Sequence, residues 1–183
     1  MNLLAIDSAG SILSIAVSCG KNIFYKESET GSRSSESAML IIDNVMTDAS
    51  LKPDALNGVV CLSGPGSFTG LRIGYSIAKG LALSLSIPFT VVPTLDCMAY
   101  PFSNNNELIL CAIEARKNAW YYSIYQNGIS QSEIKTGGIE QINAENVRVI
   151  YKDRGYAREL LEIGRTLDFS GNGGLFLGPE YFA

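Results

Sequence analysis

The strongest constraint on the fold is an eleven-residue segment at positions 64–74, GPGSFTGLRIG, which places four glycines between a strand-like run and a helical run. The apolar, β-branched run at 58–62 before it is typical of a buried strand. The segment fits neither common nucleotide-binding loop. It lacks the Lys-Ser/Thr pair that ends the pattern G-x-x-x-x-G-K-[ST], and its third glycine lies one residue later than in the pattern G-x-G-x-x-G. We therefore predict a turn that starts a helix, with anion binding at the helix N-terminus as a minor reading.

The helix predicted after this turn extends to about Ser86 and carries only Arg72 and Lys79 as charged residues. Beside its stripe of larger apolar residues runs a stripe of small ones, namely Gly70, Gly74, Ala78 and Ala82. A helix that is apolar or small almost all round is normally buried on more than one side. We expect one side to face a sheet and the other to contact a helix, either 36–49 of this chain or one from another subunit.

The first hundred residues show a mixed α/β pattern. We predict strands at 2–7, 12–19 and 23–28, a helix at 36–49, a strand at 58–62, the helix to 86, a strand at 89–92 and a short helix from 94 to 100. Early strands joined by short turns indicate antiparallel hairpins. Alternating helices and strands after them indicate a mixed sheet with helices packed on it.

A polar run at 101–107 separates this part from a second one, and we place the domain boundary there, giving lobes of 1–101 and 102–183. The second lobe is predicted to hold strands at 108–113 and 118–126, a hairpin turn at Asn127-Gly128 and a short helix near 155–165. The Asn-Gly pair is a strong hairpin signal because both residues tolerate positive φ.

The absence of histidine removes several classes of active site. Ser-His-Asp and Cys-His nucleophile systems need an imidazole, which argues against a peptidase. Zinc sites of the HExxH kind need two imidazole ligands. Carboxylate chemistry and Mg²⁺ held by oxygen ligands remain open on this ground alone, and we predict no catalytic residues and no metal ligands.

Charge and cysteine content bear on partners and location. The net charge is −4 with no cluster of Lys and Arg, so we do not expect the chain to bind nucleic acid by itself. The four cysteines form no C-x-x-C pair and are expected to be reduced core residues. No apolar stretch approaches the roughly 18 residues of a membrane span, and no basic segment precedes the apolar start, so we expect a cytoplasmic protein.

Several segments together resemble the TsaB family, also called YeaZ. The run at 64–74, followed by Ala78-Lys79-Gly80-Leu81-Ala82, is similar to the signature of that family. Three other segments agree in order and spacing: Leu4-Ala5-Ile6-Asp7-Ser8, then Ser35-Glu36 with Ile42-Asp43, and Ala112-Ile113-Glu114-Ala115-Arg116. The chain departs from the family pattern at Ser34, where the family has histidine, and in a shortened second lobe.

The resemblance implies an α/β, actin-like ATPase fold (ASKHA, ribonuclease-H-like) with two lobes, the second shortened. It implies tRNA processing: a dimerising protein, without catalytic activity of its own, that joins the catalytic homologue TsaD and the ATPase TsaE in threonylcarbamoyl transfer to adenosine 37 of tRNA (t6A modification). The catalytic relative holds its metal with a His-x-x-x-His pair, which this chain lacks. The alternative is a free-standing actin-like small-molecule kinase or ATPase, which would need a complete second lobe and an acidic base there.

We predict that helices 36–49 and 71–86 bind the TsaD-like partner, or a second copy when the chain is alone. The predicted interface residues are Ser35, Glu36, Met39, Ile42, Asp43, Gly70, Arg72, Gly74, Ala78 and Lys79. Asp7 and Ser8 have two readings, residual nucleotide binding and turn capping, and capping is favoured because Asp is a common turn residue. We expect no cofactor for the chain by itself and leave open ATP or ADP with Mg²⁺ at a subunit interface.

Overall fold

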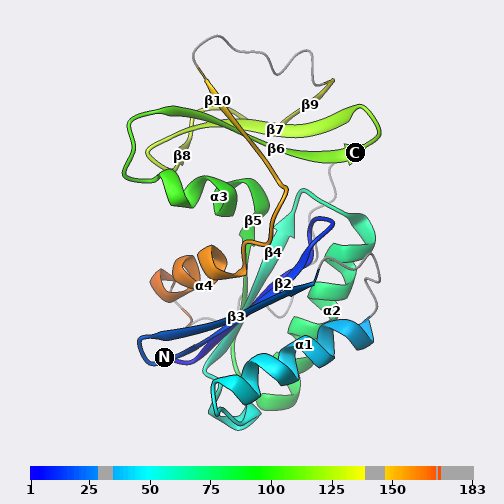
Figure 1. The fold of residues 1–183 in the computed structure, drawn as a ribbon, viewed down its shortest axis with the longest axis vertical. Coiled ribbons are helices and arrows are strands. Elements are labelled where there is room, and N and C mark those ends of the chain that lie inside the picture. The colour runs from blue at the N-terminus through cyan, green and yellow to red at the C-terminus, as the bar shows by residue number, and fades with distance from the viewer. Residues whose placement is uncertain (29–34, 139–146, 168, 170–183) are drawn as a thin grey trace.

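A computed structural model describes residues 1–28, 35–138, 147–167 and 169 of the 183-residue chain (Figure 1). The described residues form two sheets with helices around the first and between the two. None of the described helices has the length and apolarity needed to cross a bilayer.

The first sheet has the strand order β3-β2-β1-β4-β5. Its strands are β1 (Leu3–Asp7), β2 (Leu13–Cys19), β3 (Asn22–Ser28), β4 (Gly58–Gly64) and β5 (Phe89–Pro93). β2 pairs antiparallel with β1 and β3, whereas β4 pairs parallel with β1 and β5. This confirms the mixed sheet and the early hairpins. All residues of β1 and β4 are buried, as expected for central strands covered on both faces.

Two helices cover one face of this sheet, α1 (Ser35–Asp48) and α2 (Phe68–Leu85). Ala38 and Val45 of α1 and Ala78 of α2 share one buried cluster with Ile6 and Val59 of the sheet. α1 begins one residue before the predicted helix. α2 ends as predicted, where Ser86 adopts a left-handed φ of 54°, but it begins inside the Gly-rich segment.

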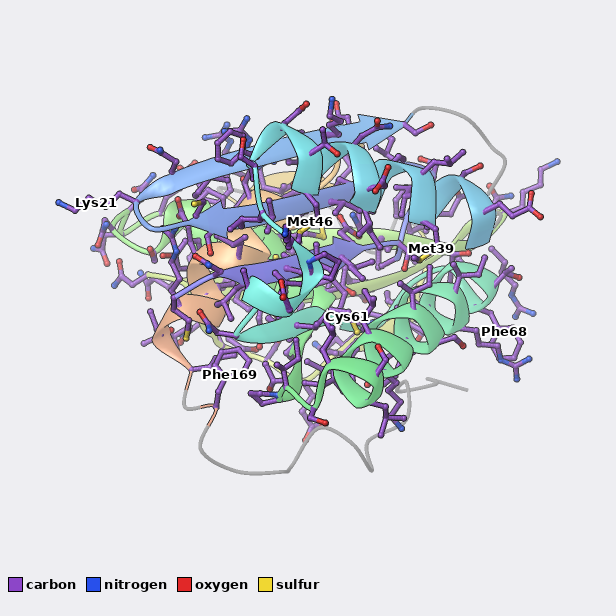
Figure 2. All side chains as sticks on the ribbon, turned by 90° about the horizontal axis from the view of Figure 1, so that it is seen from below. Lys21, Met39, Met46, Cys61, Phe68 and Phe169 are labelled. Carbon is purple, nitrogen blue, oxygen red and sulfur yellow. The ribbon has the colours of Figure 1, made fainter. Side chains whose placement is uncertain are left out.

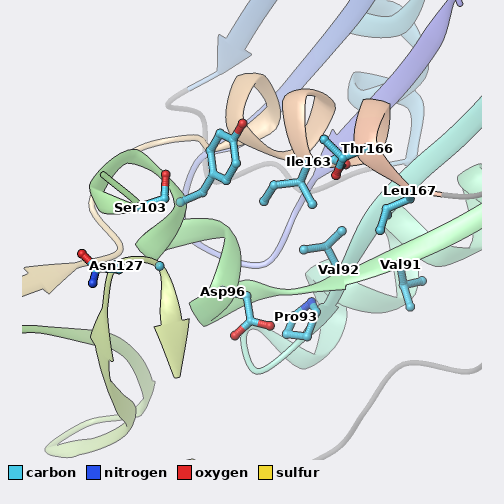
Figure 3. Close-up of a pocket in the computed structure, with 11 residues that line it drawn as sticks. Val91, Val92, Pro93, Asp96, Ser103, Asn127, Ile163, Thr166 and Leu167 are labelled. Atoms are coloured by element: carbon cyan, nitrogen blue, oxygen red, sulfur yellow. Dashed lines mark hydrogen bonds between the residues drawn. The ribbon is translucent and has the colours of Figure 1, made fainter. Parts of the chain in front are cut away.

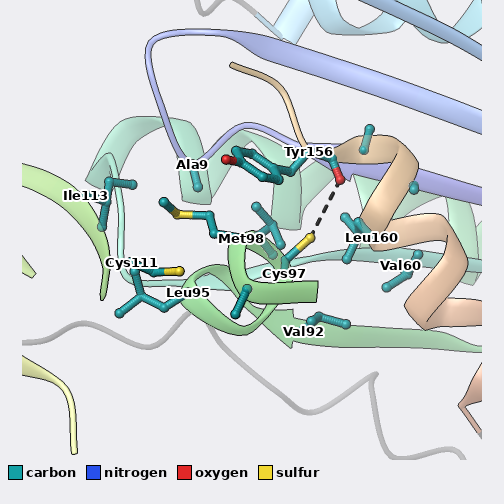
Figure 4. Packing of buried hydrophobic residues seen from close by; sticks show 14 of the residues in the cluster. Ala9, Val60, Val92, Leu95, Cys97, Met98, Cys111, Ile113, Tyr156 and Leu160 are labelled. Carbon is teal, nitrogen blue, oxygen red and sulfur yellow. Dashed lines mark hydrogen bonds between the residues drawn. The ribbon is translucent and has the colours of Figure 1, made fainter. Parts of the chain in front are cut away.

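The opposite face packs against α3 (Thr94–Ala99) and α4 (Ala157–Thr166). Figure 4 shows Leu95, Cys97 and Met98 of α3 close to Leu160 of α4 and Val60 of β4. Short 3-10 turns lie at Pro53–Ala55 and Tyr100–Phe102. The C-terminal part of the chain thus returns to complete the core of the first sheet.

The second sheet has the strand order β10-β6-β7-β8, and β9 also pairs with β7. Its strands are β6 (Leu108–Arg116), β7 (Ala119–Gln126), β8 (Ile129–Ser130), β9 (Lys135–Gly137) and β10 (Arg148–Tyr151). β6 and β7 pair antiparallel, and β10 pairs parallel with β6. Asn127 and Gly128 have φ values of 53° and 73° between β7 and β8, which confirms the predicted hairpin.

The predicted hairpin turn implies β8, but no sequence pattern predicts β9 or β10, and these three strands have two to four residues each. Strands this short do not have enough residues to show the alternation of apolar and polar side chains. The two sheets divide the chain between β5 and β6, but α4 belongs to the second predicted lobe and packs on the first sheet. The lobe boundary at residue 101 stays a prediction.

Candidate functional site

The Gly-rich segment lies against the loop that follows β1. Ser67 donates its backbone N–H to the carbonyl oxygen of Ala9 at 2.6 Å. Its side-chain oxygen accepts a hydrogen bond from the N–H of Gly70 at 3.2 Å and caps α2. The segment therefore fixes the start of α2 on the carboxyl end of β1.

Three glycines make this close approach possible. A Cβ at Gly66 would lie 2.5 Å from the carbonyl oxygen of Ala9, and one at Gly70 would lie 2.0 Å from that of Ser8. A Cβ at Gly74 would lie 2.3 Å from the Ser8 hydroxyl oxygen. These distances are shorter than any non-bonded contact that a carbon atom tolerates. Gly66 and Gly70 are needed because backbone passes directly over backbone, and Gly74 leaves room for the Ser8 side chain.

This arrangement corrects the expectation that the small-residue side of α2 meets another helix or a partner. Gly70, Gly74 and Ala78 are buried against the first sheet of the same chain, so they do not line an outer surface. Ile42 of α1 is likewise buried, at 6 % exposure. The physical reason is that the sheet, and not a second helix, offers the flat backbone that small residues can approach.

The outer side of the two helices carries the exposed interface candidates. Glu36, Met39, Asp43 and Arg72 are exposed, and Lys79 is half-buried. Ser35 opens α1, and its side chain lies outside the described residues. Three exposed apolar residues of these helices were not among the predictions: Leu83 near the end of α2, and Leu40 and Phe68 near the predicted interface positions. The signal of the latter two was present in the sequence, as large apolar residues next to the predicted interface positions.

We call Met39, Leu40, Phe68, Arg72 and Ile73 the helix surface. Met39, Leu40 and Phe68 are 44 %, 66 % and 50 % exposed. The guanidinium of Arg72 lies 3.8 Å from the centre of the Phe68 ring, a cation–π contact. Phe68, Arg72 and Ile73 also line a hollow of about 360 Å³. Figure 2 shows Met39 and Phe68 at the same end of the molecule.

Asp7, at the end of β1, is completely buried, and both oxygens of its carboxylate accept hydrogen bonds. Its Oδ2 accepts hydrogen bonds from Lys152 Nζ at 2.7 Å and from the backbone N–H of Tyr156 at 2.8 Å. Its Oδ1 accepts from the N–H of Ala9 at 3.1 Å, which is the turn-capping bond that the sequence favoured. Lys152 was not predicted, because no local pattern connects two residues 145 positions apart.

The residues around Asp7 do not fit a magnesium-bound phosphate. Both carboxylate oxygens already accept N–H bonds, and the ammonium of Lys152 supplies the positive charge that a metal would supply. Ser8 is 8 % exposed and lies under α2. Within the described residues, no three Asp, Glu, Cys or His side chains gather into a metal-binding group. Asp7 therefore joins β1 to the segment before α4.

The four cysteines are all free thiols, as predicted. Cys61, Cys97 and Cys111 are buried and Cys19 is partly exposed. Burial raises the pKa of the Cys61 and Cys97 thiols, and it raises that of Cys111 to about 12. Thiols of this kind are not activated nucleophiles.

Comparisons with known proteins agree on one family. Residues 28–153 match the family model described as TsaD, tRNA N6-adenosine threonylcarbamoyltransferase. The chain is 33 % identical over 144 residues to the tRNA threonylcarbamoyladenosine biosynthesis protein TsaB of Bacillus subtilis, covering 78 % of this chain and 59 % of that protein. It is 33 % identical over 146 residues to the TsaB of Buchnera aphidicola subsp. Schizaphis graminum, covering 77 % of this chain and 69 % of that protein.

Among solved structures, YeaZ from Pseudomonas aeruginosa superposes with a TM-score of 0.79 at 20 % identity, covering 90 % of each chain. The chain therefore has the fold of YeaZ, as the sequence predicted. The chain spans about three fifths of the length of the Bacillus subtilis protein.

Proposed function

The chain belongs to the TsaB family, also called YeaZ, and from this premise we propose that it is a non-catalytic partner subunit of a TsaD-like threonylcarbamoyltransferase. In this role it takes part in t6A biosynthesis by forming a heterodimer. The observation that carries the proposal is the 33 % identity to TsaB proteins along more than three quarters of this chain.

The side chains support a binding role over a catalytic one. The chain has no histidine, so it cannot supply imidazole ligands or an imidazole base. Asp7 is enclosed by N–H donors and by Lys152. The alternative of a free-standing actin-like kinase is disfavoured, because it would need a free carboxylate at this strand end.

We propose that the helix surface is where the TsaD-like subunit binds. Its large exposed apolar side chains are Met39, Leu40 and Phe68, and Arg72 stacks on the Phe68 ring. Aromatic residues, methionine and arginine are the types enriched at protein interfaces. Glu36 and Asp43 lie exposed on α1 and provide charged positions at its rim. The same surface would pair two copies of the chain when no partner is present.

A TsaE-like ATPase completes the proposed complex, which we expect to work in the cytoplasm, where tRNA is modified. We propose that this chain alone holds no nucleotide, and that ATP or ADP with Mg²⁺ binds only where two subunits meet. Titration calorimetry with ATP and Mg²⁺ tests this: the isolated chain should give no binding heat at micromolar nucleotide. Saturable heat from the isolated chain would favour the kinase alternative.

Reconstitution is the decisive test of the function. TsaD and TsaE from the same organism are incubated with unmodified tRNA and a threonylcarbamoyl donor, with and without this chain. Mass spectrometry of the digested tRNA then measures threonylcarbamoyladenosine. We expect the modified nucleoside only when the chain is present. Equal amounts in both reactions would contradict the proposal.

A further inference from the structure

A second concave site lies away from the helix surface, at the junction of the two sheets. It is a pocket of about 370 Å³ between β5, α3, the β7–β8 turn and α4 (Figure 3). Pockets that bind small molecules typically measure roughly 300–1,000 Å³. Its position, bordered by both sheets, is typical of ligand sites in folds of two lobes.

The described walls of this junction pocket are mainly apolar, and one of the described lining residues is charged. Val92, Pro93, Ile163 and Leu167 supply apolar surface, and Figure 3 shows them around a common space. Among the described residues that line the pocket, Asp96 is the charged one, and none is a lysine or an arginine. The pocket therefore presents one negative charge within an apolar enclosure.

The carboxylate of Asp96 is held in place by a buried phenol. The Tyr125 hydroxyl donates a hydrogen bond to Asp96 Oδ1 at 2.6 Å, and Tyr125 is 2 % exposed. Burial, followed by this hydrogen bond, raises the pKa of Tyr125, so the phenol remains a donor at neutral pH. A short hydrogen bond from a rigid ring fixes the direction of the carboxylate.

Asp96 forms no ion pair with any lysine or arginine in the part of the chain that the structure describes. A carboxylate has about four acceptor positions, and Tyr125 occupies one of them. A negative charge that is fixed, partly enclosed and unmatched attracts a positively charged donor far more than a neutral or anionic one.

We propose that the junction pocket binds a small organic cation, an amine carried on a compact apolar body. The ammonium group donates to Asp96, and the apolar body lies against Val92, Ile163 and Leu167. The same reasoning disfavours phosphates and carboxylates, which Asp96 would repel and for which the described lining offers no lysine or arginine. This site is independent of the helix surface and of the proposed role in tRNA modification.

Three probes of similar size and different charge test the proposal in solution. Benzylamine, benzyl alcohol and benzoate are titrated into the isotopically labelled full chain, and chemical-shift changes in its NMR spectrum are fitted. We expect saturable binding of benzylamine, with shifts at residues of the pocket, and affinities at least about tenfold lower for the other two. One factor of ten corresponds to about 1.4 kcal/mol. Equal binding of all three, tighter binding of benzoate, or no binding of benzylamine would overturn the proposal.

Variants locate the site. Asp96→Asn removes the charge and keeps an acceptor for Tyr125, so it should weaken benzylamine at least about tenfold and leave benzyl alcohol unchanged. Asp54→Asn, an exposed carboxylate outside the pocket, is the matched control and should change neither. Unchanged benzylamine affinity in Asp96→Asn would refute the role of this carboxylate. If Asp96→Asn does not fold, the comparison of the three probes on the unmodified chain still tests whether the pocket prefers a cation.

Discussion

Lys152 and Asp7 form an ion pair with a nitrogen–oxygen distance of 2.7 Å, and their side chains are 1 % and 0 % exposed. The pair connects the end of β1 to the residues that lead into α4. Ala157 adds a second connection, because its N–H donates to the Ser14 hydroxyl at 3.1 Å. Both charges of this pair are therefore shielded from solvent.

Removing Lys152 should destabilise the fold strongly. Lys152→Met leaves the Asp7 carboxylate buried without a counter-charge, and breaking a buried pair in this way typically costs about 3–5 kcal/mol. The free energy of unfolding is measured by urea denaturation. Lys26→Met is the control, because the Lys26–Asp48 pair is 39 % and 52 % exposed and such pairs contribute about 0–1 kcal/mol.

The double variant Asp7→Asn/Lys152→Met separates charge from packing. It leaves no unpaired charge, so it should be more stable than Lys152→Met alone. If the two variants are equally stable, or if Lys152→Met costs no more than Lys26→Met, the ion pair is not what holds this junction.

Gly70→Ala should destabilise the chain, because the new Cβ would lie 2.0 Å from the backbone oxygen of Ser8 and α2 would have to move. Overpacking of this kind typically costs about 1–3 kcal/mol. Gly80→Ala on the same helix meets nothing within 4 Å and should instead stabilise by about 0.5–1 kcal/mol. Urea denaturation of the two variants compares a crowded and an open glycine, and similar effects at both would contradict the contact between Gly70 and Ser8.

Phe68→Asp and Arg72→Glu should weaken binding to the TsaD-like subunit by about tenfold or more while the fold survives, because both side chains project from the helix surface. Titration calorimetry measures the affinity, and circular dichroism checks the fold. Ile129→Asp is the control, since Ile129 is 66 % exposed on β8 in the second sheet. Unchanged affinity in both helix variants would place the interface elsewhere.

Thiol reactivity should distinguish Cys19 from the other three cysteines. At pH 8 the raised pKa values keep Cys61, Cys97 and Cys111 protonated in the folded chain, and burial blocks access to them. Ellman's reagent should therefore react quickly with one thiol in the native protein and with four after denaturation. Cys19→Ser should remove the fast phase, and a fast phase of two or more thiols would show that the core opens.

The same thiols give a pH dependence of stability. Their folded pKa values lie above the ordinary value of 9.0, so they stay protonated in the folded state when unfolded thiols ionise. Stability should be constant from pH 7 to 8 and should fall as the pH rises above about 9. Urea denaturation across this range measures the effect, and a rise in stability above pH 9 would contradict it.

Local sequence patterns were sufficient to predict most of the elements near the site. The i, i+3, i+4 pattern gave α1 to within one residue, and the β-branched run before Gly64 gave β4. Positive φ values at Asn127 and Gly128 explain why that pair identified its hairpin. Each of these features depends on neighbours in the sequence.

The features that escaped prediction depend on distant contacts. The small-residue stripe of α2 was visible in the sequence, but the sequence does not state whether a helix or the backbone of Ser8 lies against it. The junction pocket is assembled from β5, α3, the β7–β8 turn and α4, and no residue spacing in the sequence predicts that these parts meet. Asp96 lies near the start of the predicted short helix, and no sequence pattern marks it as a pocket residue.

The position of α4 also has a consequence for how the protein is made. Leu160 and Leu161 complete the apolar face formed by Ala5, Ala16 and Val60, which are synthesised much earlier. While the chain is being translated, α3 can cover only part of this face, the part under α4 stays uncovered, and Asp7 has no ammonium to pair with until Lys152 leaves the ribosome. The first strands to be synthesised thus reach their final packing only when almost the whole described chain has emerged.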